Sequence, residues 1–464
     1  MSGGYLSRIM ITAALCLNFA AHGASPLEPV EPAGPDISDA TNENTPHEAF
    51  PLMLLPVYEP TARRTELPNP EREREWRALK TKILNDFSGR MSSDFKIPAG
   101  LRERTEFWFD IYTKYGEAHH IVHHLRYPWI IFKVVDTTET LLNGKGPMWL
   151  RHDRASKLAK QEAAQIRAAL KKLAARKDYS NLSSLEKHLY DKLLPLPGSR
   201  KSVFLAASAN VRSQLGQKDF FQRGLINSSR YLPYMEEAFY QLGLPSELTR
   251  MPFVESSFNE DARSKVGASG IWQIMPNTGK AYMNVSELID ERNSPLKATV
   301  TAARLLRSYY HALGSWPLTI TSYNHGIGNI HKAIKKAGSK DLAIIIERYH
   351  QGDFRFASSN FFTCFLAALY AEKYHELIFK ELPREPLQET EMLRLTGPTK
   401  ASQVIKITGI ERATLLKYNL DLRNALRQDA FLPRGYMLHL PPGFKDRLTQ
   451  RRIGVQERSR RPRT

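Results

Sequence analysis

Between about residue 219 and residue 372, almost every segment of the chain has the periodicity of an amphipathic helix, and Gly or Pro residues mark the breaks. Apolar residues that recur every three to four positions put one face of each segment against a core. Gly243 ends one segment, and Pro245 with Ser246 begins the next. The spacing predicts single helices over 219–243 and 246–255, within a mainly α domain.

The N-terminus has the pattern of a secretory signal peptide. Arg8 precedes an apolar run over 9–20, and small residues follow it. We therefore expect export, with an uncleaved membrane anchor as the alternative. Leu15 is too large for lipoprotein cleavage before Cys16, so a lipid anchor is not expected. After cleavage only Cys364 remains, and no intramolecular disulfide can form.

Changes in composition predict the boundaries of the remaining parts. In the N-terminal domain helices are expected over 154–176, 183–194 and 201–214. Near the C-terminus MLRLT and GYMLHLP read as strands around two short helices, ASQVIKIT and RATLLKYN. The predicted parts are a signal peptide (1–23), a flexible linker (24–64), a mostly helical N-terminal domain of unknown role (65–217), the helical domain (218–376), a small α+β module (385–445) and a basic disordered tail (446–464).

Four histidines in HHIVHH, at 119, 120, 123 and 124, raise the question of a metal site. On a helix they would form two i, i+4 pairs with plausible ligand geometry. Apolar and β-branched residues on both sides of Arg126-Tyr127-Pro128 instead predict a β-hairpin. Neighbouring strand residues point to opposite faces, so a metal site is not expected. No cofactor is expected for this chain either.

The chain carries 66 Lys and Arg against 48 Asp and Glu, a formal charge of +18. Such a charge suits an anionic partner, and for an exported chain the candidates are polyanionic wall or membrane surfaces. The basic tail, with seven Arg against two acids, is expected to add to this retention. Nucleic acid is the competing partner, but no DNA-binding motif supports it.

The stretch FVESSF places Glu255 at the C-terminal end of a predicted helix, beside Phe253 and Val254. Burial disfavours the charged form of a carboxyl group and raises its pKa. The negative end of the helix dipole acts in the same direction. Glu255 is therefore a candidate general acid. Glu260 and Asp261 lie in the polar stretch NEDARS and are expected at the surface instead.

Two further stretches could bind a sugar. The small residues of GASG let a ligand or a backbone approach closely, and Gln273 follows with an amide suited to an acetamido or hydroxyl group. Farther along, SYNHG gives the phenol of Tyr323, the amide of Asn324 and an imidazole before a glycine bend.

Together these stretches resemble the catalytic domain of the soluble-type lytic transglycosylases, family 1. Glu255-Ser256 matches the Glu-Ser motif, Ser264 with GASGIWQIMP matches a Gly-Leu-Met-Gln-like signature, and SYNHG stands in the place of Ala-Tyr-Asn-Ala-Gly. The resemblance covers roughly residues 220–375. It implies a lysozyme-like helical fold that cleaves the β-1,4 bond between N-acetylmuramic acid and N-acetylglucosamine in peptidoglycan. It also implies Glu255 as the sole catalytic residue, with a sugar site lined by Ser264, Gln273, Met275, Tyr323 and Asn324.

One glutamate suffices for such a reaction. Glu255 protonates the leaving oxygen, and the 2-acetamido oxygen of the substrate stabilises the anomeric carbon in place of a second carboxylate. The deprotonated Glu255 then removes the proton of the muramic C6 hydroxyl, which closes a 1,6-anhydro ring. Because this nucleophile is tethered to the substrate, no activated water is needed.

The sequence departs from the family at its third motif, Glu-Thr-x-x-Tyr-Val, where ASSNFF stands over 357–362. Phe361 keeps the packing role of the tyrosine without its hydrogen bond, and the glutamate that could support Tyr323 is absent. The C-terminal module resembles LysM, a βααβ fold that binds N-acetylglucosamine chains, although the usual opening Tyr-x-Val-x-x-Gly-Asp-Thr-Leu is missing.

The sequence thus predicts an exported peptidoglycan lytic transglycosylase in the periplasm, associated with the cell wall or outer membrane. A hydrolytic muramidase on the same fold is the nearest alternative, with water in place of the C6 hydroxyl. A non-catalytic peptidoglycan-binding protein is the alternative of another class.

Overall fold

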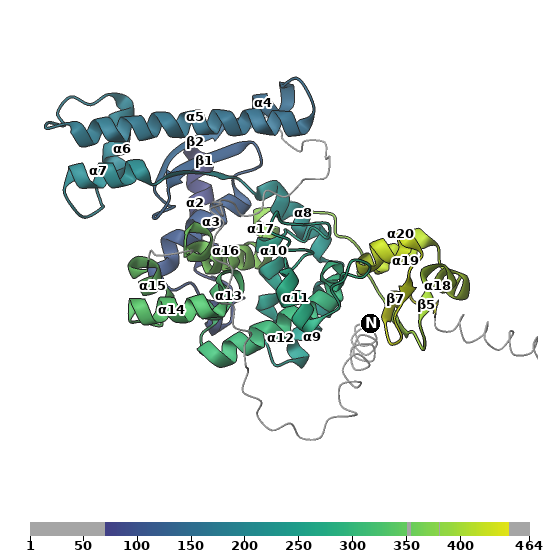
Figure 1. Cartoon of the computed structure of the whole chain (residues 1–464). Coiled ribbons are helices and arrows are strands. Elements are labelled where there is room, and N and C mark those ends of the chain that lie inside the picture. The colour runs from purple at the N-terminus through teal and green to yellow at the C-terminus, as the bar shows by residue number, and fades with distance from the viewer. Residues whose placement is uncertain (1–69, 350–353, 380, 445–464) are drawn as a thin grey trace, which may run out of the picture.

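The computed structural model describes residues 70–349, 354–379 and 381–444, so the predicted signal peptide, linker and basic tail lie outside the described residues. Figure 1 shows an arm built on a long helix, a central helical body and a small C-terminal module. The prediction of a mainly α fold is confirmed. In the described part of the chain, no helix combines the length and the apolar character needed to span a membrane.

The arm is a three-stranded antiparallel sheet covered on one face by helices. The strand order is β2-β1-β3, and His120 of the central strand lies opposite Val135 and Leu215. The predicted hairpin is therefore confirmed. The elements of the arm are β1 (His119–His124), β2 (Ile131–Asp136), α4 (Thr138–Asn143), α5 (Met148–Ala175), α6 (Ser184–Leu193), α7 (Arg200–Ala209) and β3 (Val211–Leu215).

The predicted helix over 201–214 is wrong in its second half. The helix ends at Ala209, Asn210 leaves the helical region with φ −112° and ψ 26°, and β3 begins at Val211. The open edge of β1 accounts for this difference, since it supplies backbone hydrogen bonds that a helix over the same residues would forgo. The helices over 154–176 and 183–194 are confirmed as α5 and α6, and α5 begins six residues earlier than predicted.

The central body consists of helices from both sides of the predicted boundary at residue 218. They are α2 (Pro70–Leu84), α3 (Arg102–Thr113), α8 (Lys218–Ser228), α9 (Leu232–Gln241), α10 (Met251–Glu255), α11 (Pro276–Tyr282), α12 (Pro295–Leu313), α13 (Trp316–His325), α14 (Ile327–Ala337), α15 (Leu342–Arg348), α16 (Phe356–Lys373) and α17 (His375–Ile378). The single helix predicted over 219–243 is instead α8 and α9. Pro233, which lacks an amide hydrogen, stands at the start of α9, where that hydrogen is not needed.

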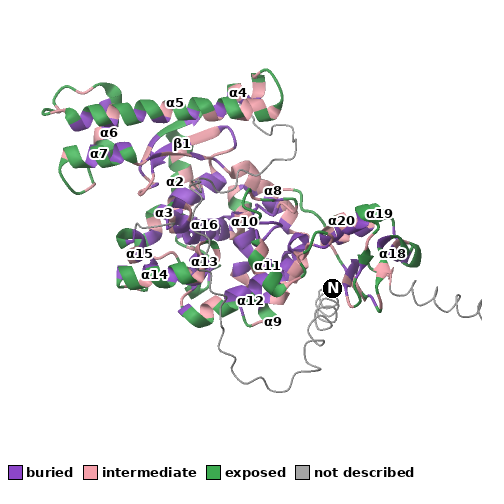
Figure 2. Cartoon of the chain, viewed as in Figure 1, coloured by how far each residue is buried: buried purple, intermediate pink, exposed green. Residues whose placement is uncertain are grey.

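One continuous hydrophobic core runs through the body. α16 is buried on nearly all sides, and its Phe361 and Phe365 lie in the same cluster as Trp108 and Phe109 of α3. Figure 2 shows this buried centre, with exposed residues on the outer helices. α2 and α3 therefore complete the core of the helical domain. The boundary at residue 218 stays a prediction from composition, and the core crosses it.

The C-terminal module has a separate small core under two short antiparallel ladders, β4 with β7 and β5 with β6. Its elements are β4 (Glu391–Arg394), β5 (Thr399–Lys400), α18 (Ala401–Thr408), α19 (Arg412–Tyr418), α20 (Arg423–Gln428), β6 (Phe431–Leu432) and β7 (Met437–Leu440). The two strands and two helices predicted here are present, together with a third helix and a second ladder. The likeness to LysM stays a prediction.

Candidate functional site

Glu255 is the last residue of α10, which follows a 3₁₀ turn over Ser246–Arg250. The predicted helix over 246–255 is therefore two short pieces. Buried Phe253 and Val254 flank the glutamate, whose own side chain keeps a partly exposed surface. Burial raises the pKa of the Glu255 carboxyl to about 8. Within the described residues, no hydrogen bond or ion pair engages this carboxyl group.

The backbone after Glu255 is held in an unusual conformation. Ser257 and Phe258 have φ of 50° and 54°, in the left-handed region that residues other than glycine rarely adopt. Each such residue costs about 1–3 kcal/mol, and they concentrate at functional sites. Ser256 fixes the turn, because its buried hydroxyl donates to the carbonyl of Ile271 at 2.9 Å. Through this hydrogen bond, Ser256 connects the backbone next to Glu255 to the loop that contains Ile271.

That loop, residues 262–275, carries three of the predicted sugar-site residues. The Gln273 side-chain amide nitrogen donates to the carbonyls of Ala262, at 3.1 Å, and Gly270, at 2.8 Å. Its two N–H groups are therefore committed to the loop, and only its oxygen Oε1 is left to accept from a ligand. Ser264 is also part of the loop structure, since its hydroxyl accepts from the amide of Ala268 at 2.9 Å. Met275, by contrast, is 43% exposed.

Gly270 is the point at which this loop touches the next segment. Its φ is +75°, and a Cβ placed there would lie 2.0 Å from the carbonyl oxygen of Arg292. Arg292 in turn donates from one guanidinium nitrogen to the carbonyls of Gly267, at 2.7 Å, and Ile274, at 3.1 Å. Asp290 holds the other side of the guanidinium at 2.8 Å. Sequence reasoning missed Arg292, because nothing near it in the chain marks its partners.

Tyr323 and Asn324, near the end of α13, complete the predicted site. The Tyr323 hydroxyl donates to the carbonyl of Trp272 at 2.8 Å, beside Gln273. Burial, and then the charge of Glu255, raise the pKa of Tyr323 well above its usual value. Asn324 is exposed, and its side-chain oxygen accepts from the Ser358 hydroxyl at 3.0 Å.

Ser358 belongs to ASSNFF, where the sequence departs from the family motif. Its hydroxyl lies 3.0 Å from Asn324 Oδ1 and 3.1 Å from His325 Nδ1. α16 thus contacts the SYNHG turn through a serine. We did not expect this contact, because the glutamate and the tyrosine of the family motif are absent here. Tyr323 is held from the other side, by the carbonyl of Trp272.

The two carboxylates near Glu255 in the sequence are both engaged elsewhere. Glu260 forms an ion pair with Arg230 at 3.1 Å and accepts from the Tyr231 hydroxyl at 2.6 Å. Asp261 pairs with Arg423 of the C-terminal module. Neither carboxylate contributes to the pKa of Glu255, which burial alone raises. The structure therefore offers one protonated carboxyl group at this place.

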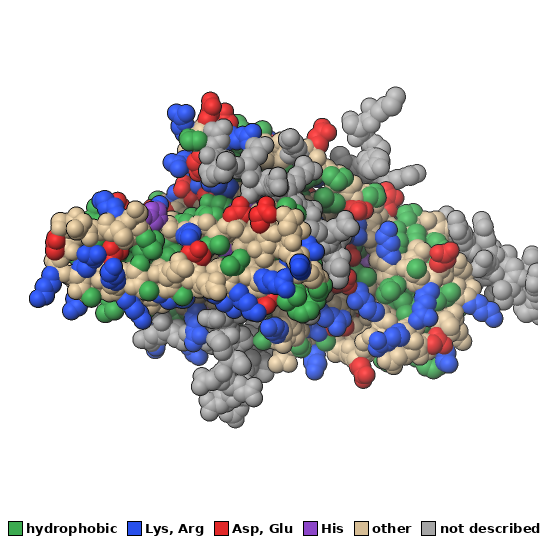
Figure 3. Space-filling model, turned by 90° about the horizontal axis from the view of Figure 1, so that it is seen from above, with side chains coloured by type: hydrophobic (Ala, Val, Ile, Leu, Met, Phe, Trp, Pro, Cys, Tyr) green, Lys and Arg blue, Asp and Glu red, His purple; other side chains and the backbone are tan. Residues whose placement is uncertain are grey.

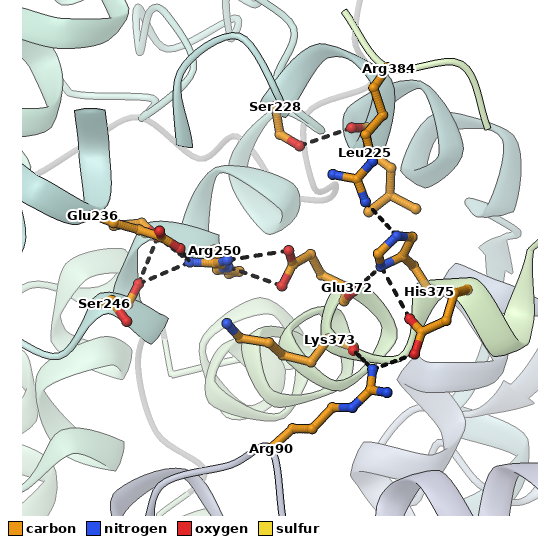
Figure 4. A network of polar contacts seen from close by, with 12 residues as sticks. Arg90, Leu225, Ser228, Glu236, Ser246, Arg250, Glu372, Lys373, His375 and Arg384 are labelled. Carbon is orange, nitrogen blue, oxygen red and sulfur yellow. Dashed lines mark hydrogen bonds and ion pairs between the residues drawn. The ribbon is translucent and has the colours of Figure 1, made fainter. Parts of the chain in front are cut away.

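A buried network holds the start of α10. Figure 4 shows the Arg250 guanidinium between Glu236 of α9 and Glu372 of α16. The contact to Glu372 is two-pronged, at 3.1 and 3.2 Å. Burial would raise the pKa of Glu372, but the charge and hydrogen bonds of Arg250 outweigh it and keep that pKa below its usual value. This network fixes the short helix that ends at Glu255.

Comparison with known proteins identifies the family of this domain. Residues 235–346 match the family model of the transglycosylase SLT domain. Membrane-bound lytic murein transglycosylase D of Escherichia coli K12 is 37% identical over 82 residues, which are 17% of this chain and 18% of that protein. The same protein from a second Escherichia coli strain matches equally. The match thus spans less than a fifth of the length of these curated relatives.

Among solved structures, the 70 kDa soluble lytic transglycosylase of Escherichia coli aligns with 68% of this chain and 58% of its own, at 15% identity and a TM-score of 0.27. At this TM-score and identity, the similarity shows neither the fold nor the function of this chain. The match over 235–346 includes Glu255, Ser264, Gln273, Met275, Tyr323 and Asn324. The predicted membership of the SLT family is confirmed for this domain.

Proposed function

We propose that this protein is a peptidoglycan lytic transglycosylase that uses Glu255 first as general acid and then as general base. The observation that carries the proposal is the Glu255 carboxyl group, whose pKa burial raises to about 8 with no second carboxylate engaged beside it. A carboxyl group with this pKa holds its proton at neutral pH and can give it to a leaving glycosidic oxygen.

The surrounding residues suit the binding of an N-acetylated glycan. Gln273 Oε1 can accept a hydrogen bond from an acetamido N–H, because its amide nitrogen is already bound to the loop. Met275 offers an exposed apolar surface for a sugar face, and the exposed Asn324 amide can donate to a hydroxyl. Ser264 contributes by shaping the loop. The bond cleaved would be the β-1,4 linkage between N-acetylmuramic acid and N-acetylglucosamine.

The surroundings of Glu255 also support the proposed second half of the reaction. After protonating the leaving oxygen, ionised Glu255 lies in a poorly solvated place with no positive partner, so it regains a proton readily. The muramic C6 hydroxyl supplies that proton as its oxygen bonds to the anomeric carbon. The product is a 1,6-anhydro ring, and the enzyme returns to its starting protonation state. Such acid–base assistance contributes about 10²–10⁴-fold.

The relatives are named as murein transglycosylases, and murein lies in the cell envelope. We infer the same location for this chain. Export to the periplasm through the N-terminal segment, and retention through the basic tail, are part of the proposal. Binding of glycan by the C-terminal module also belongs to it. The support is that β4 and β7 pair around helices as in a βααβ fold, with β5, β6 and α20 added.

Mass spectrometry of the fragments released from purified sacculi tests the proposal. Wild-type protein should release muropeptides that end in 1,6-anhydro-muramic acid, and Glu255→Gln should release none while keeping its fold and its retention on sacculi. Fragments with free reducing ends would assign a hydrolytic muramidase. Full activity in Glu255→Gln would overturn the single-glutamate mechanism, and no release by the wild type would favour a binding protein.

A further inference from the structure

The longest helix in the described part of the chain, α5, presents a row of cations that the proposed reaction does not use. Over residues 148–209 the arm holds 13 Lys and Arg against 5 Asp and Glu. Figure 3, seen from the side of α5, shows basic side chains spread over this arm. At 100° per residue Trp149, Lys157, Lys160, Arg167 and Lys171 fall within an arc of about 80° on α5. All five are exposed.

An adjoining side of α5, about 100° round the helix from this row, is fixed to the arm. Ala159, Ala163, Ile166 and Leu170 are buried there, so the helix cannot rotate to hide its cations. Figure 2 shows this division into a buried and an exposed side. The row from Trp149 to Lys171 therefore forms a straight ridge about 33 Å long.

Several of these cations are available to a partner. Lys160 and Lys171 have no hydrogen bond or ion pair to any residue that the structure describes. Lys157 pairs with Asp153 at 2.7 Å but is 68% exposed, and such surface pairs are weak. Arg167 donates to the carbonyl of Val211, a contact that brings no opposing charge. The ridge is thus positive along its length, with Asp153 as its one acidic member.

We propose that this ridge docks the protein on an anionic phospholipid bilayer. Trp149, which is 71% exposed at one end, would insert at the headgroup level, where amphipathic indole rings are favoured. A straight, convex row of cations matches a flat anionic surface, whereas a single polymer strand is better held in a groove. The interaction lies outside the glycan site and is independent of the proposed cleavage.

Flotation of the full mature chain with vesicles tests the docking. Binding should be strong to vesicles that contain phosphatidylglycerol and weak to pure phosphatidylcholine. Because each lysine near an anionic surface contributes about fivefold in binding, the triple variant Lys157→Gln, Lys160→Gln, Lys171→Gln should bind on the order of a hundredfold more weakly.

A matched control removes the same charge from another face. Lys332, Lys335 and Lys340 are exposed on and just after α14, on the far side of the body from α5 in Figure 1. Their replacement by Gln should leave vesicle binding within about twofold of wild type. Equal losses in both triple variants would show that only net charge matters and would overturn the proposal.

The fluorescence of Trp149 tests the orientation of α5 on the bilayer independently. Vesicles with brominated acyl chains should quench part of the tryptophan fluorescence of the wild type, and Trp149→Phe should remove that part. Unchanged quenching in Trp149→Phe would overturn the proposed orientation. Weaker retention of the α5 variant on sacculi, with vesicle binding unchanged, would assign the ridge to the wall polymer and overturn the lipid assignment.

Discussion

At the scale of single residues, the proposed role of Glu255 predicts that its protonation sets the working pH range. Its acid form is present below the pKa of about 8 and is lost as the pH rises through that value. We expect kcat/KM on soluble glycan fragments to fall about tenfold per pH unit above this point. Rates measured from pH 6 to 10, with binding to sacculi as the control, check this. Activity that falls already above pH 5 would contradict a raised pKa.

The same carboxyl group should lower the stability of the fold near neutral pH. Its folded pKa lies above the unfolded value of 4.5, so the unfolded state binds fewer protons between pH 4.5 and 8, and stability falls as the pH rises. Glu255→Gln removes this cost. We expect the variant to be more stable than wild type by on the order of 1–2 kcal/mol at pH 7.5, since the side chain is partly solvated, and equally stable at pH 4. Urea unfolding at both pH values measures the difference.

Ser358 should act on substrate binding more than on stability. Ser358→Ala removes the hydroxyl that contacts Asn324 and His325, at a stability cost of about 1 kcal/mol. Because Asn324 loses a fixed position at the exposed end of α13, KM should rise a few-fold while kcat changes little. Ser359→Ala, on the next position of α16, is the matched control. An equal rise in KM for both variants would place the effect in α16 as a whole.

At the scale of elements, the short helix α10 depends on neighbours far away in the chain. Arg250→Met leaves Glu372 buried without its partner, and such a loss costs about 3–5 kcal/mol. The double variant Arg250→Met, Glu372→Leu removes both charges and should recover much of this stability. Thermal unfolding of wild type, both single variants and the double variant measures the coupling. Additive losses would show that the two residues act independently.

The loop of residues 262–275 is a second element held from a distance, by the carbonyl contacts of Arg292 and the close approach of Gly270. Gly270→Ala would force a Cβ against the Arg292 carbonyl, at a φ that alanine rarely adopts. We expect a loss of about 2–4 kcal/mol in stability and a larger loss of cleavage than of fold. Gly243→Ala also has a positive φ but meets open space, so it reports the strain without the clash. Similar effects of both substitutions would make backbone strain the whole cause.

At the scale of the whole molecule, the helical domain and the N-terminal helices share one core. Asn360 of α16 accepts from Trp108 Nε1 at 2.9 Å and from the buried Arg104 at 3.0 Å, so polar contacts also cross the boundary. A fragment of residues 218–376 alone would expose α16 where α3 now covers it. We expect this fragment to aggregate or to lack fixed tertiary structure, as near-ultraviolet circular dichroism and solubility would show. A soluble, active fragment would contradict the shared core.

The C-terminal module is attached to the body by an ion pair, by backbone hydrogen bonds and by Ile289, which is buried in the core of the module. Lys297 of α12 pairs with the buried Asp421 at 2.7 Å, and the backbone amide of Asp290 donates to the carbonyl of Asp421 at 3.1 Å. Because Asp290 also holds Arg292, a chain of contacts runs from the module to the loop of residues 262–275. The module therefore supports the site physically, whether or not it binds glycan.

The sequence by itself determined the helical class, the β-hairpin and the candidate acid, because these depend on local patterns. Apolar periodicity, turn residues and the short motifs around Glu255 and Tyr323 are properties of neighbouring residues. It also determined the family of the domain, since the three motifs keep their order and spacing.

Only the tertiary structure decided how the site is held together. Arg292, Ser358 and Arg250 each bind at least one partner that lies 18 to 122 residues away, and no local pattern marks such contacts. The same reason explains the errors: β3 forms because β1 offers it an edge. Long-range packing likewise decided that α3 belongs to the core of the helical domain, because an apolar helix face does not specify which helix will cover it.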